Sequence, residues 1–154
     1  QSAQVIHISG TLTWPKVKAN LANISDDCRR YYRAYPYLHD EMGAGFRAAD
    51  LVLARAGASM LGEAPAFGLP SIMVPLTFAW RYQKVNADYL TKRGAAVRLT
   101  DEQLPEKMLP TVLSLLQDKQ RLHEMREAAR ELDMPNGAKN LAQVIIDTAK
   151  GAVL

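Results

Sequence analysis

The fold of this chain is decided by residues 50–75, which read DLVLARAGASMLGEAPAFGLPSIMVP. Residues 51–54 are a short apolar run that predicts a strand, and Gly57 breaks the chain after it. Residues 59–67 have helical spacing and end at Gly68. A second apolar strand follows at residues 71–74, between two prolines. The stretch therefore predicts a strand, a helix and a second strand.

The same alternation continues on both sides of this stretch. Further strands are predicted at residues 4–9, 30–37 and 95–99, the first of them as a buried strand closed by Gly10. Helices are predicted at residues 14–24, 39–49, 82–92, 101–117, 119–132 and 137–151. Thr100 and Gln103 have the spacing of a capping box, and breaks near Asp118 and at residues 135–137 divide the last three helices.

Short strands that alternate with helices predict an α/β fold, with a Rossmann-like parallel sheet covered by helices on both faces. The length of 154 residues suits a single domain, residues 1–154, with one core. Sheets of this kind bind ligands beyond the carboxyl ends of their strands. The loops after residues 51–54 and 71–74 are therefore the expected binding site.

The first of these loops leads from a strand through small residues into a helix. Small side chains let a ligand approach the backbone closely, and the N–H groups at the helix start suit a phosphate. Ser59 can add a hydroxyl donor, and Glu63, one turn later, can accept hydrogen bonds from both hydroxyls of a ribose. The alternative is an ordinary turn followed by an exposed glutamate.

The second loop, residues 75–87, begins at the same edge of the predicted sheet. Gln83 and Asn86 are three residues apart and share a helix face. Their amides suit sugar hydroxyls because they both donate and accept, although they can equally cap or decorate a helix. Phe78 and Trp80 either pack into the core or face a partner.

Composition excludes several classes of protein. No apolar run approaches the roughly 20 residues of a membrane span, and no N-terminal segment has the pattern of a signal peptide. The single cysteine, Cys28, favours a reducing, cytoplasmic location. The net charge of +3 comes without the basic stripe that nucleic-acid binding requires. His7, His39 and His123 are isolated, so we expect neither a metal site nor a cofactor.

The two loops and their surroundings together resemble a known family. The matching positions are residues 49–52, 57–59, 63, 68–75, 83 and 86–87, with further similarity at residues 5–10, 37–42 and 94–96. This pattern is similar to the C-terminal domain of the MurG family of UDP-N-acetylglucosamine transferases, which act on an undecaprenyl-linked muramoyl-pentapeptide. The resemblance implies the C-terminal half of a GT-B glycosyltransferase, an inverting hexosyltransferase of peptidoglycan synthesis.

The resemblance also implies binding roles for seven residues of a nucleotide-sugar-binding domain: Leu38, His39, Ala58, Ser59, Met60, Glu63 and Gln83. Residues 38–39 would border the uracil through main-chain groups, and residues 58–60 would present their backbone to the diphosphate. Glu63 would hold the ribose hydroxyls, and Gln83 would touch the hydroxyls of N-acetylglucosamine. Arg55 would support the site structurally.

Some features depart from the family pattern. Tyr82 stands where many members have histidine or glutamine, and residues 76–80 are unusually apolar. The family's first βα unit, with a glycine-rich loop, is absent, as is the acceptor domain that holds the proposed general base. We therefore expect no catalytic residue in this chain and no activity from it alone.

The expected partners are UDP-N-acetylglucosamine, a lipid-linked acceptor, a separate acceptor domain or partner chain, and, peripherally, the inner face of the bacterial plasma membrane. Two other functions fit the same residues. One is the donor-binding subunit of a split lipid-sugar transferase, or a related lipid glycosyltransferase. The other is a nucleotide-binding module without catalysis.

Overall fold

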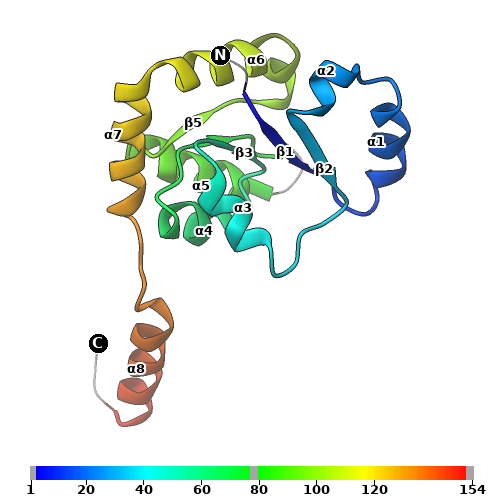
Figure 1. The fold of residues 1–154 in the computed structure, drawn as a ribbon. Coiled ribbons are helices and arrows are strands. Elements are labelled where there is room, and N and C mark those ends of the chain that lie inside the picture. The colour runs from blue at the N-terminus through cyan, green and yellow to red at the C-terminus, as the bar shows by residue number, and fades with distance from the viewer. Residues whose placement is uncertain (1–2, 77–79, 152–154) are drawn as a thin grey trace. The chain divides into compact units, whose positions relative to one another are not determined.

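The computed structural model describes residues 3–76 and 80–151. Its strands are β1 (Val5–Ile8), β2 (Tyr32–Tyr35), β3 (Val52–Ala54), β4 (Ser71–Met73) and β5 (Ala96–Arg98). Its helices are α1 (Trp14–Leu21), α2 (Asp26–Arg29), α3 (Met42–Ala48), α4 (Met60–Ala66), α5 (Trp80–Lys92), the 3-10 helix η1 (Asp101–Gln103), α6 (Leu104–Gln117), α7 (Lys119–Arg130) and α8 (Gly137–Ala149) (Figure 1). All the predicted strands and helices are present, and α2 was not predicted.

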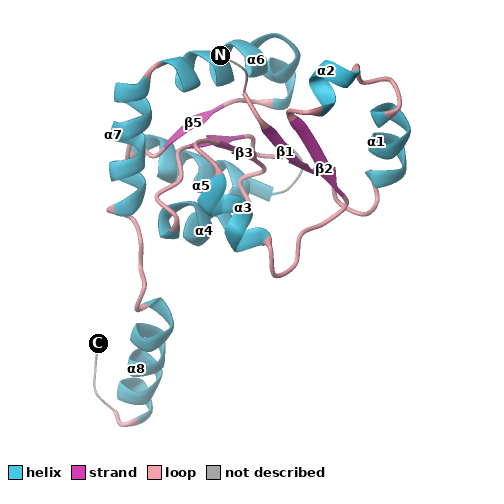
Figure 2. Ribbon diagram, in the orientation of Figure 1, coloured by secondary structure: helices cyan, strands magenta, loops and turns pink. Residues whose placement is uncertain are grey.

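The strands are parallel, as predicted, but they form two ladders. β1 pairs with β2, and these two strands lie side by side in Figure 2. β4 lies between β3 and β5 in the second ladder. Within the described residues, neither strand of the first ladder pairs with a strand of the second. The chain divides correspondingly into two compact units, residues 1–48 and residues 49–154, which we call the first and second units.

The second unit contains the core. Ile72 and Val74 of the β4 region pack with Leu115 of α6 and with Leu122 and Met125 of α7. Side chains alternate along a strand, so Met73 points to the other face of the sheet, and it is fully buried as well. The three-stranded sheet is thus covered on both faces, which fixes the positions of the loops at its ends.

Local signals in the sequence account for the ends of the helices in this unit. Gly68 follows α4 with φ +56°, and the N–H of Leu69 donates to the carbonyl of Ala64 at 2.8 Å. The capping box is present before α6, where Gln103 Oε1 accepts from the Thr100 N–H at 3.0 Å. Asp118 accepts from the backbone N–H of Arg121 at 2.9 Å and so begins α7.

The first unit is built differently, since none of the residues 3–48 is buried. The prediction that β1 is a buried strand is wrong: Val5 is 45% exposed and Ile6 is 47% exposed. The apolar sequence of β1 is enough to form a strand beside β2. The sequence of β1 alone does not determine which of its side chains become buried, because burial depends on the helices or strands that pack against it.

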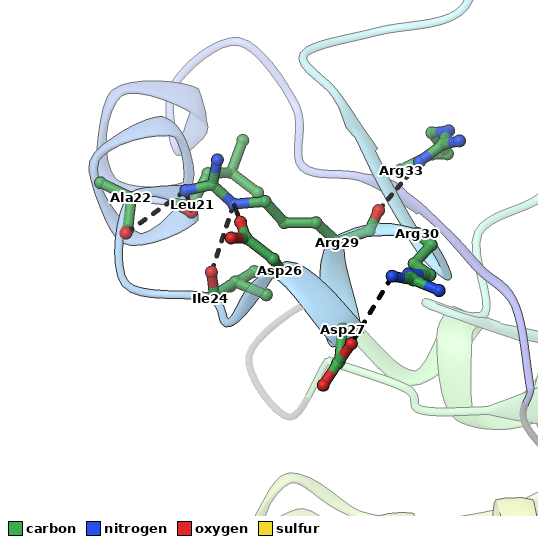
Figure 3. A network of polar contacts seen from close by, with 8 residues as sticks. All are labelled: Leu21, Ala22, Ile24, Asp26, Asp27, Arg29, Arg30 and Arg33. Atoms are coloured by element: carbon green, nitrogen blue, oxygen red, sulfur yellow. Dashed lines mark hydrogen bonds and ion pairs between the residues drawn. The ribbon is translucent and has the colours of Figure 1, made fainter.

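Polar contacts connect the elements of the first unit. Figure 3 shows the Arg29 guanidinium at the end of α1, where its Nη2 donates to the carbonyl of Leu21 at 3.0 Å and its Nε donates to that of Ile24 at 3.2 Å. The last carbonyls of a helix lack partners within it, so an arginine placed there caps the helix. The Tyr32 hydroxyl lies 2.5 Å from His7 Nδ1 across the β1–β2 pair.

No helix within the described ranges is long and apolar enough to cross a membrane.

Candidate functional site: the carboxyl edge of the β3–β4–β5 sheet

The predicted loops leave neighbouring strands at the same edge of the sheet. Ala54 lies opposite Met73 in the parallel β3–β4 ladder, and the N–H of Val74 donates to the carbonyl of Ala54 at 2.9 Å. The chain continues from β3 into residues 55–59 and from β4 into Pro75 and Leu76. The expectation that both loops lie at one sheet edge is therefore confirmed for these residues.

The turn after β3 is closed by its own backbone. The N–H of Gly57 donates to the carbonyl of Arg55 at 2.9 Å, and the N–H of Met60 donates to that of Gly57 at 3.2 Å. The N–H groups of Ala58 and Ser59 donate to no acceptor within residues 3–76 and 80–151. A Cβ placed on Gly57 would meet nothing within 4 Å. The turn therefore presents two backbone donors beside open space.

Glu63 and Ser59 add side-chain groups to this turn. Ser59 is exposed and is the N-cap of α4, but its hydroxyl makes no capping hydrogen bond. Glu63 is partly buried, and its carboxylate has neither a hydrogen bond nor an ion pair with any side chain or backbone group of the described chain. A carboxylate accepts hydrogen bonds only, so this one is suited to a ligand that donates them.

Met60 does not present its backbone in the way the resemblance implies. Its N–H is already bonded to Gly57, and its side chain is buried. The residue anchors the first turn of α4 in the core. Of the three predicted backbone donors, Ala58 and Ser59 are the two that carry no bond among the residues described here.

The two amides of α5 hold the loops rather than projecting freely. Gln83 Oε1 accepts from the Leu76 N–H at 3.0 Å, which leaves its Nε2 to donate elsewhere. Asn86 Nδ2 donates to the carbonyl of Ala56 at 3.0 Å. Sequence reasoning placed both amides on one helix face but missed these bonds. Spacing within a helix cannot reveal a backbone partner 30 residues away in the chain.

An ion pair adds a further connection at this edge. Arg55 Nη1 lies 2.6 Å from Asp101 Oδ1, which joins the residue after β3 to the start of η1, beyond β5. The arginine is thus paired within the second unit, as expected for structural support. Phe78 lies outside the described residues, and Trp80 is the first residue of α5, two residues before the predicted start of that helix.

Leu38 and His39 belong to the first unit and follow β2. A Cβ on Gly45 of α3 would lie 3.5 Å from Leu38 Cδ1, an ordinary van der Waals contact, so the Leu38 side chain lies next to α3. The exposed His39 ring lies 4.8 Å from the Tyr37 ring, centroid to centroid, with the planes inclined by 60°. The carbonyl of His39 accepts from the Met42 N–H at 3.2 Å.

A cavity of about 780 Å³ lies elsewhere in the second unit, between α5, β5 and α7, with Asp88, Arg98 and Arg121 in its wall. No group of three or more histidine, cysteine or acidic side chains in the described ranges is arranged to hold a metal ion.

Comparison with known proteins identifies the family. Residues 1–143 match the family described as the glycosyltransferase family 28 C-terminal domain. The chain belongs to this family. The family 28 resemblance extends to a crystal structure of MurG from Acinetobacter baumannii, with a TM-score of 0.78, 26% sequence identity, and coverage of 94% of this chain and 41% of that one.

Two curated relatives carry the name UDP-N-acetylglucosamine–N-acetylmuramyl-(pentapeptide) pyrophosphoryl-undecaprenol N-acetylglucosamine transferase. The relative from Halothermothrix orenii is 35% identical over 97% of this chain and 41% of its own length. The relative from Chlorobaculum tepidum is 42% identical over 75% of this chain and 32% of its own length. This family 28 chain therefore spans less than half the length of the relatives it matches.

A second solved structure supports the fold alone. The glycosyltransferase VinC, crystallised with dTDP, has a TM-score of 0.66 at 19% identity, with coverage of 86% of this chain and 29% of that one. The family 28 chain is thus an α/β, Rossmann-like domain of the kind found in the C-terminal half of GT-B glycosyltransferases, and the predicted resemblance to the MurG family is confirmed.

Proposed function

We propose that this chain supplies the UDP-sugar donor site of an inverting hexosyltransferase. The reaction transfers N-acetylglucosamine from UDP-N-acetylglucosamine to a lipid-linked muramoyl-pentapeptide during peptidoglycan synthesis. The family membership and the printed activity of the relatives support this proposal. Because the chain spans 41% of the Halothermothrix orenii relative, we assign the acceptor site and the general base to the remainder of such a protein.

One observation carries the proposal. In the six residues 58–63, which follow the turn after β3, two backbone N–H groups, one hydroxyl and one carboxylate have no partner in the described part of the chain. Backbone and hydroxyl donors match phosphate oxygens, and a carboxylate matches the paired hydroxyls of a ribose. A ribose and its diphosphate present these two chemistries side by side.

The chemistry of this turn is electrostatic. Negative charge grows on the UDP diphosphate as the glycosidic bond to the sugar breaks. The N–H groups of Ala58 and Ser59, with the Ser59 hydroxyl, would donate to that charge and lower the barrier. Glu63 would fix the ribose and Gln83 Nε2 the sugar hydroxyls, so that the anomeric carbon is held in position for attack from the opposite face.

The remaining assignments concern the first unit and the location of the protein. Main-chain groups of Leu38 and His39 would border the uracil, so the nucleotide-sugar-binding domain would extend over residues 1–154. The net charge of +3 favours an anionic surface. We place the protein in the cytoplasm, peripherally at the inner face of the plasma membrane, where a lipid-linked acceptor is exposed.

Calorimetric titration of the chain with UDP, UDP-N-acetylglucosamine and UDP-glucose tests the proposal. We expect the wild-type chain to bind all three, with N-acetylglucosamine preferred over glucose. Glu63→Gln removes the charge but preserves the shape of the side chain. It should weaken every ligand by about 1.5–3 kcal/mol, or roughly 10- to 150-fold, the range for hydrogen bonds to a charged group.

Glu106→Gln is the matched control, because Glu106 is an exposed glutamate of α6, on a different part of the second unit. It should leave all three affinities unchanged. Equal affinities for wild type and Glu63→Gln would remove Glu63 from the site. Binding of UDP without any preference among sugars would instead indicate a nucleotide-binding module.

A further inference from the structure

Strand β5 is the outer strand of the three-stranded ladder, and a cavity lies along its free edge. The cavity has a volume of about 780 Å³, and its wall includes Ala96, Val97 and Arg98 of β5 together with residues of α5 and α7. Among the described residues, β5 pairs with β4 alone. Ligand sites commonly have volumes of roughly 300–1,000 Å³, so this cavity is large enough to hold a ligand against the strand.

The backbone of β5 offers hydrogen-bonding groups along this edge. The carbonyl of Ala95 accepts from β4 at 3.2 Å, and the N–H of Leu99 donates to β4 at 3.0 Å. Because alternate residues of a strand bond to the same neighbour, the N–H and carbonyl groups of Ala96 and Arg98 face away from β4. None of these four groups has a partner in the described part of the chain. Ala96 is only 6% exposed, so a ligand that bonds to its backbone would offset the cost of a buried, unpaired polar group.

Charged side chains surround the edge, and one of them is unpaired. Arg98 Nη1 lies 2.5 Å from Asp88 Oδ1 of α5, so these two charges neutralise each other. Glu124 of α7 accepts from Gln120 Nε2 at 2.8 Å. The Arg121 guanidinium, also in the wall, has neither a hydrogen bond nor an ion pair with any residue that the structure describes. Because arginine is always charged, the wall favours a ligand that brings a carboxylate.

We propose that the free edge of β5 binds an extended peptide segment of a partner protein, with an acidic side chain of that segment paired to Arg121. The segment adds a strand to the ladder, and its backbone bonds to Ala96 and Arg98. A second copy of this chain does not fit the edge, because its own β5 is flanked by α5 and α7, which would collide with the same helices here. The proposal concerns a different edge from the donor site and does not depend on the proposed function.

The first experiment selects short random peptides, displayed on phage, on the full chain. We expect the enriched sequences to share one acidic position. A synthetic peptide of the enriched sequence should slow hydrogen exchange at the N–H groups of Ala96 and Arg98. The N–H of Val97 is the internal reference, because the register of the ladder directs it toward β4, and its exchange should change less.

A charge reversal then tests the ion pair. Arg121→Glu should weaken the acidic peptide by at least about tenfold, the effect of one hydrogen bond to a charged group, and should instead select peptides with a basic residue at that position. Lys119→Glu is the matched control, because Lys119 is an exposed residue of the same helix that is not part of the wall. It makes the same change of charge and should leave the affinity unaltered.

Backbone methylation of the peptide tests strand pairing. Alternate N–H groups of an added strand face β5, so methylating one alternate set of peptide nitrogens should abolish binding, and methylating the other set should not. Three results would overturn the proposal. The selection could enrich no acidic sequence, or the two methylated peptides could bind equally, which would indicate attraction by charge alone. Ultracentrifugation could also reveal a dimer that Arg121→Glu dissociates, in which case a second copy covers the edge.

Discussion

Different interactions stabilise the interior of each of the two units of this chain. In the second unit the sheet is covered on both faces, and the buried hydrophobic residues of the described chain all lie there. In the first unit no described residue is buried, and polar contacts such as those of Arg29 connect the elements. Burial of apolar surface is the dominant favourable term in folding. The second unit should therefore contribute most of the free energy of unfolding. The proposed diphosphate-binding turn belongs to this unit.

Matched truncations of isoleucine should show the largest difference. Ile72 is 0% exposed in β4, and Ile6 is 47% exposed in β1. Ile72→Ala removes buried methyl groups and leaves a cavity, so it should lower the free energy of unfolding by about 2–5 kcal/mol. Ile6→Ala should lower it by less than about 1 kcal/mol, because its side chain is already half in water. Urea unfolding measures the free energy of unfolding of both variants. Equal decreases in the two would contradict the proposed difference in stability between the units.

Two glycines with positive φ give a smaller difference. Gly68 has φ +56°, and a Cβ there would lie 2.8 Å from Arg130 Cγ. Gly10 has φ +76°, but a Cβ there would come no closer than 4.0 Å to another side chain. We expect Gly68→Ala to cost about 1–3 kcal/mol, from backbone strain and displacement of Arg130. Gly10→Ala should cost about 1 kcal/mol, from backbone strain alone. The same unfolding assay would contradict this ranking if Gly10→Ala proved the more damaging.

Arginine substitutions test whether polar contacts hold the first unit. Arg29→Ala removes the cap of α1 and should cost about 1 kcal/mol, with faster hydrogen exchange confined to α1 and its surroundings. Arg30→Ala removes only an exposed ion pair with Asp27, at 3.7 Å, and should cost less than about 0.5 kcal/mol. Exchange rates for α1 that are unaltered in Arg29→Ala would show that this cap contributes nothing.

The smallest expected effect concerns pH. Two hydrogen bonds lower the pKa of the exposed Glu102 carboxyl: the larger effect comes from the Thr100 side chain and the smaller from the Glu102 backbone. A group whose pKa is lowered by folding stabilises the protein above its unfolded-state pKa, and this contribution is lost as the pH falls through the folded-state value. NMR titration should therefore give a higher Glu102 pKa in Thr100→Val than in wild type. An identical pKa in the two proteins would rule out the hydroxyl as the cause.

The second unit was also the better predicted from sequence. The strands around Ile72, the end of α4 at Gly68 and the break at Asp118 follow from local signals: an apolar run, a left-handed glycine and an N-cap. These signals depend on a few neighbouring residues, so a sequence can display them. The division of the strands into two ladders depends on long-range pairing, which a local pattern does not contain.

The candidate site was predictable in its chemistry but less so in its geometry. Residue types at Ser59 and Glu63 indicated donors and an acceptor in a loop at the carboxyl edge of the sheet. The hydrogen bonds of Asn86 and Met60 depend on partners that folding brings close. In the structure the Asn86 amide donates to the Ala56 carbonyl, and the Met60 N–H donates to the Gly57 carbonyl. A sequence shows which groups can donate or accept hydrogen bonds, but it does not show which partners those groups bond in the folded chain.

The most direct test of this account is to map UDP onto the chain by ¹⁵N chemical shifts. If the turn after β3 binds the diphosphate, the N–H groups of Ala58 and Ser59 will show the largest changes, and these will saturate with the affinity measured by calorimetry. If those two signals stay unchanged while residues such as Arg98 and Arg121, in the wall of the cavity beside β5, shift instead, then the donor site has been placed at the wrong edge of the sheet.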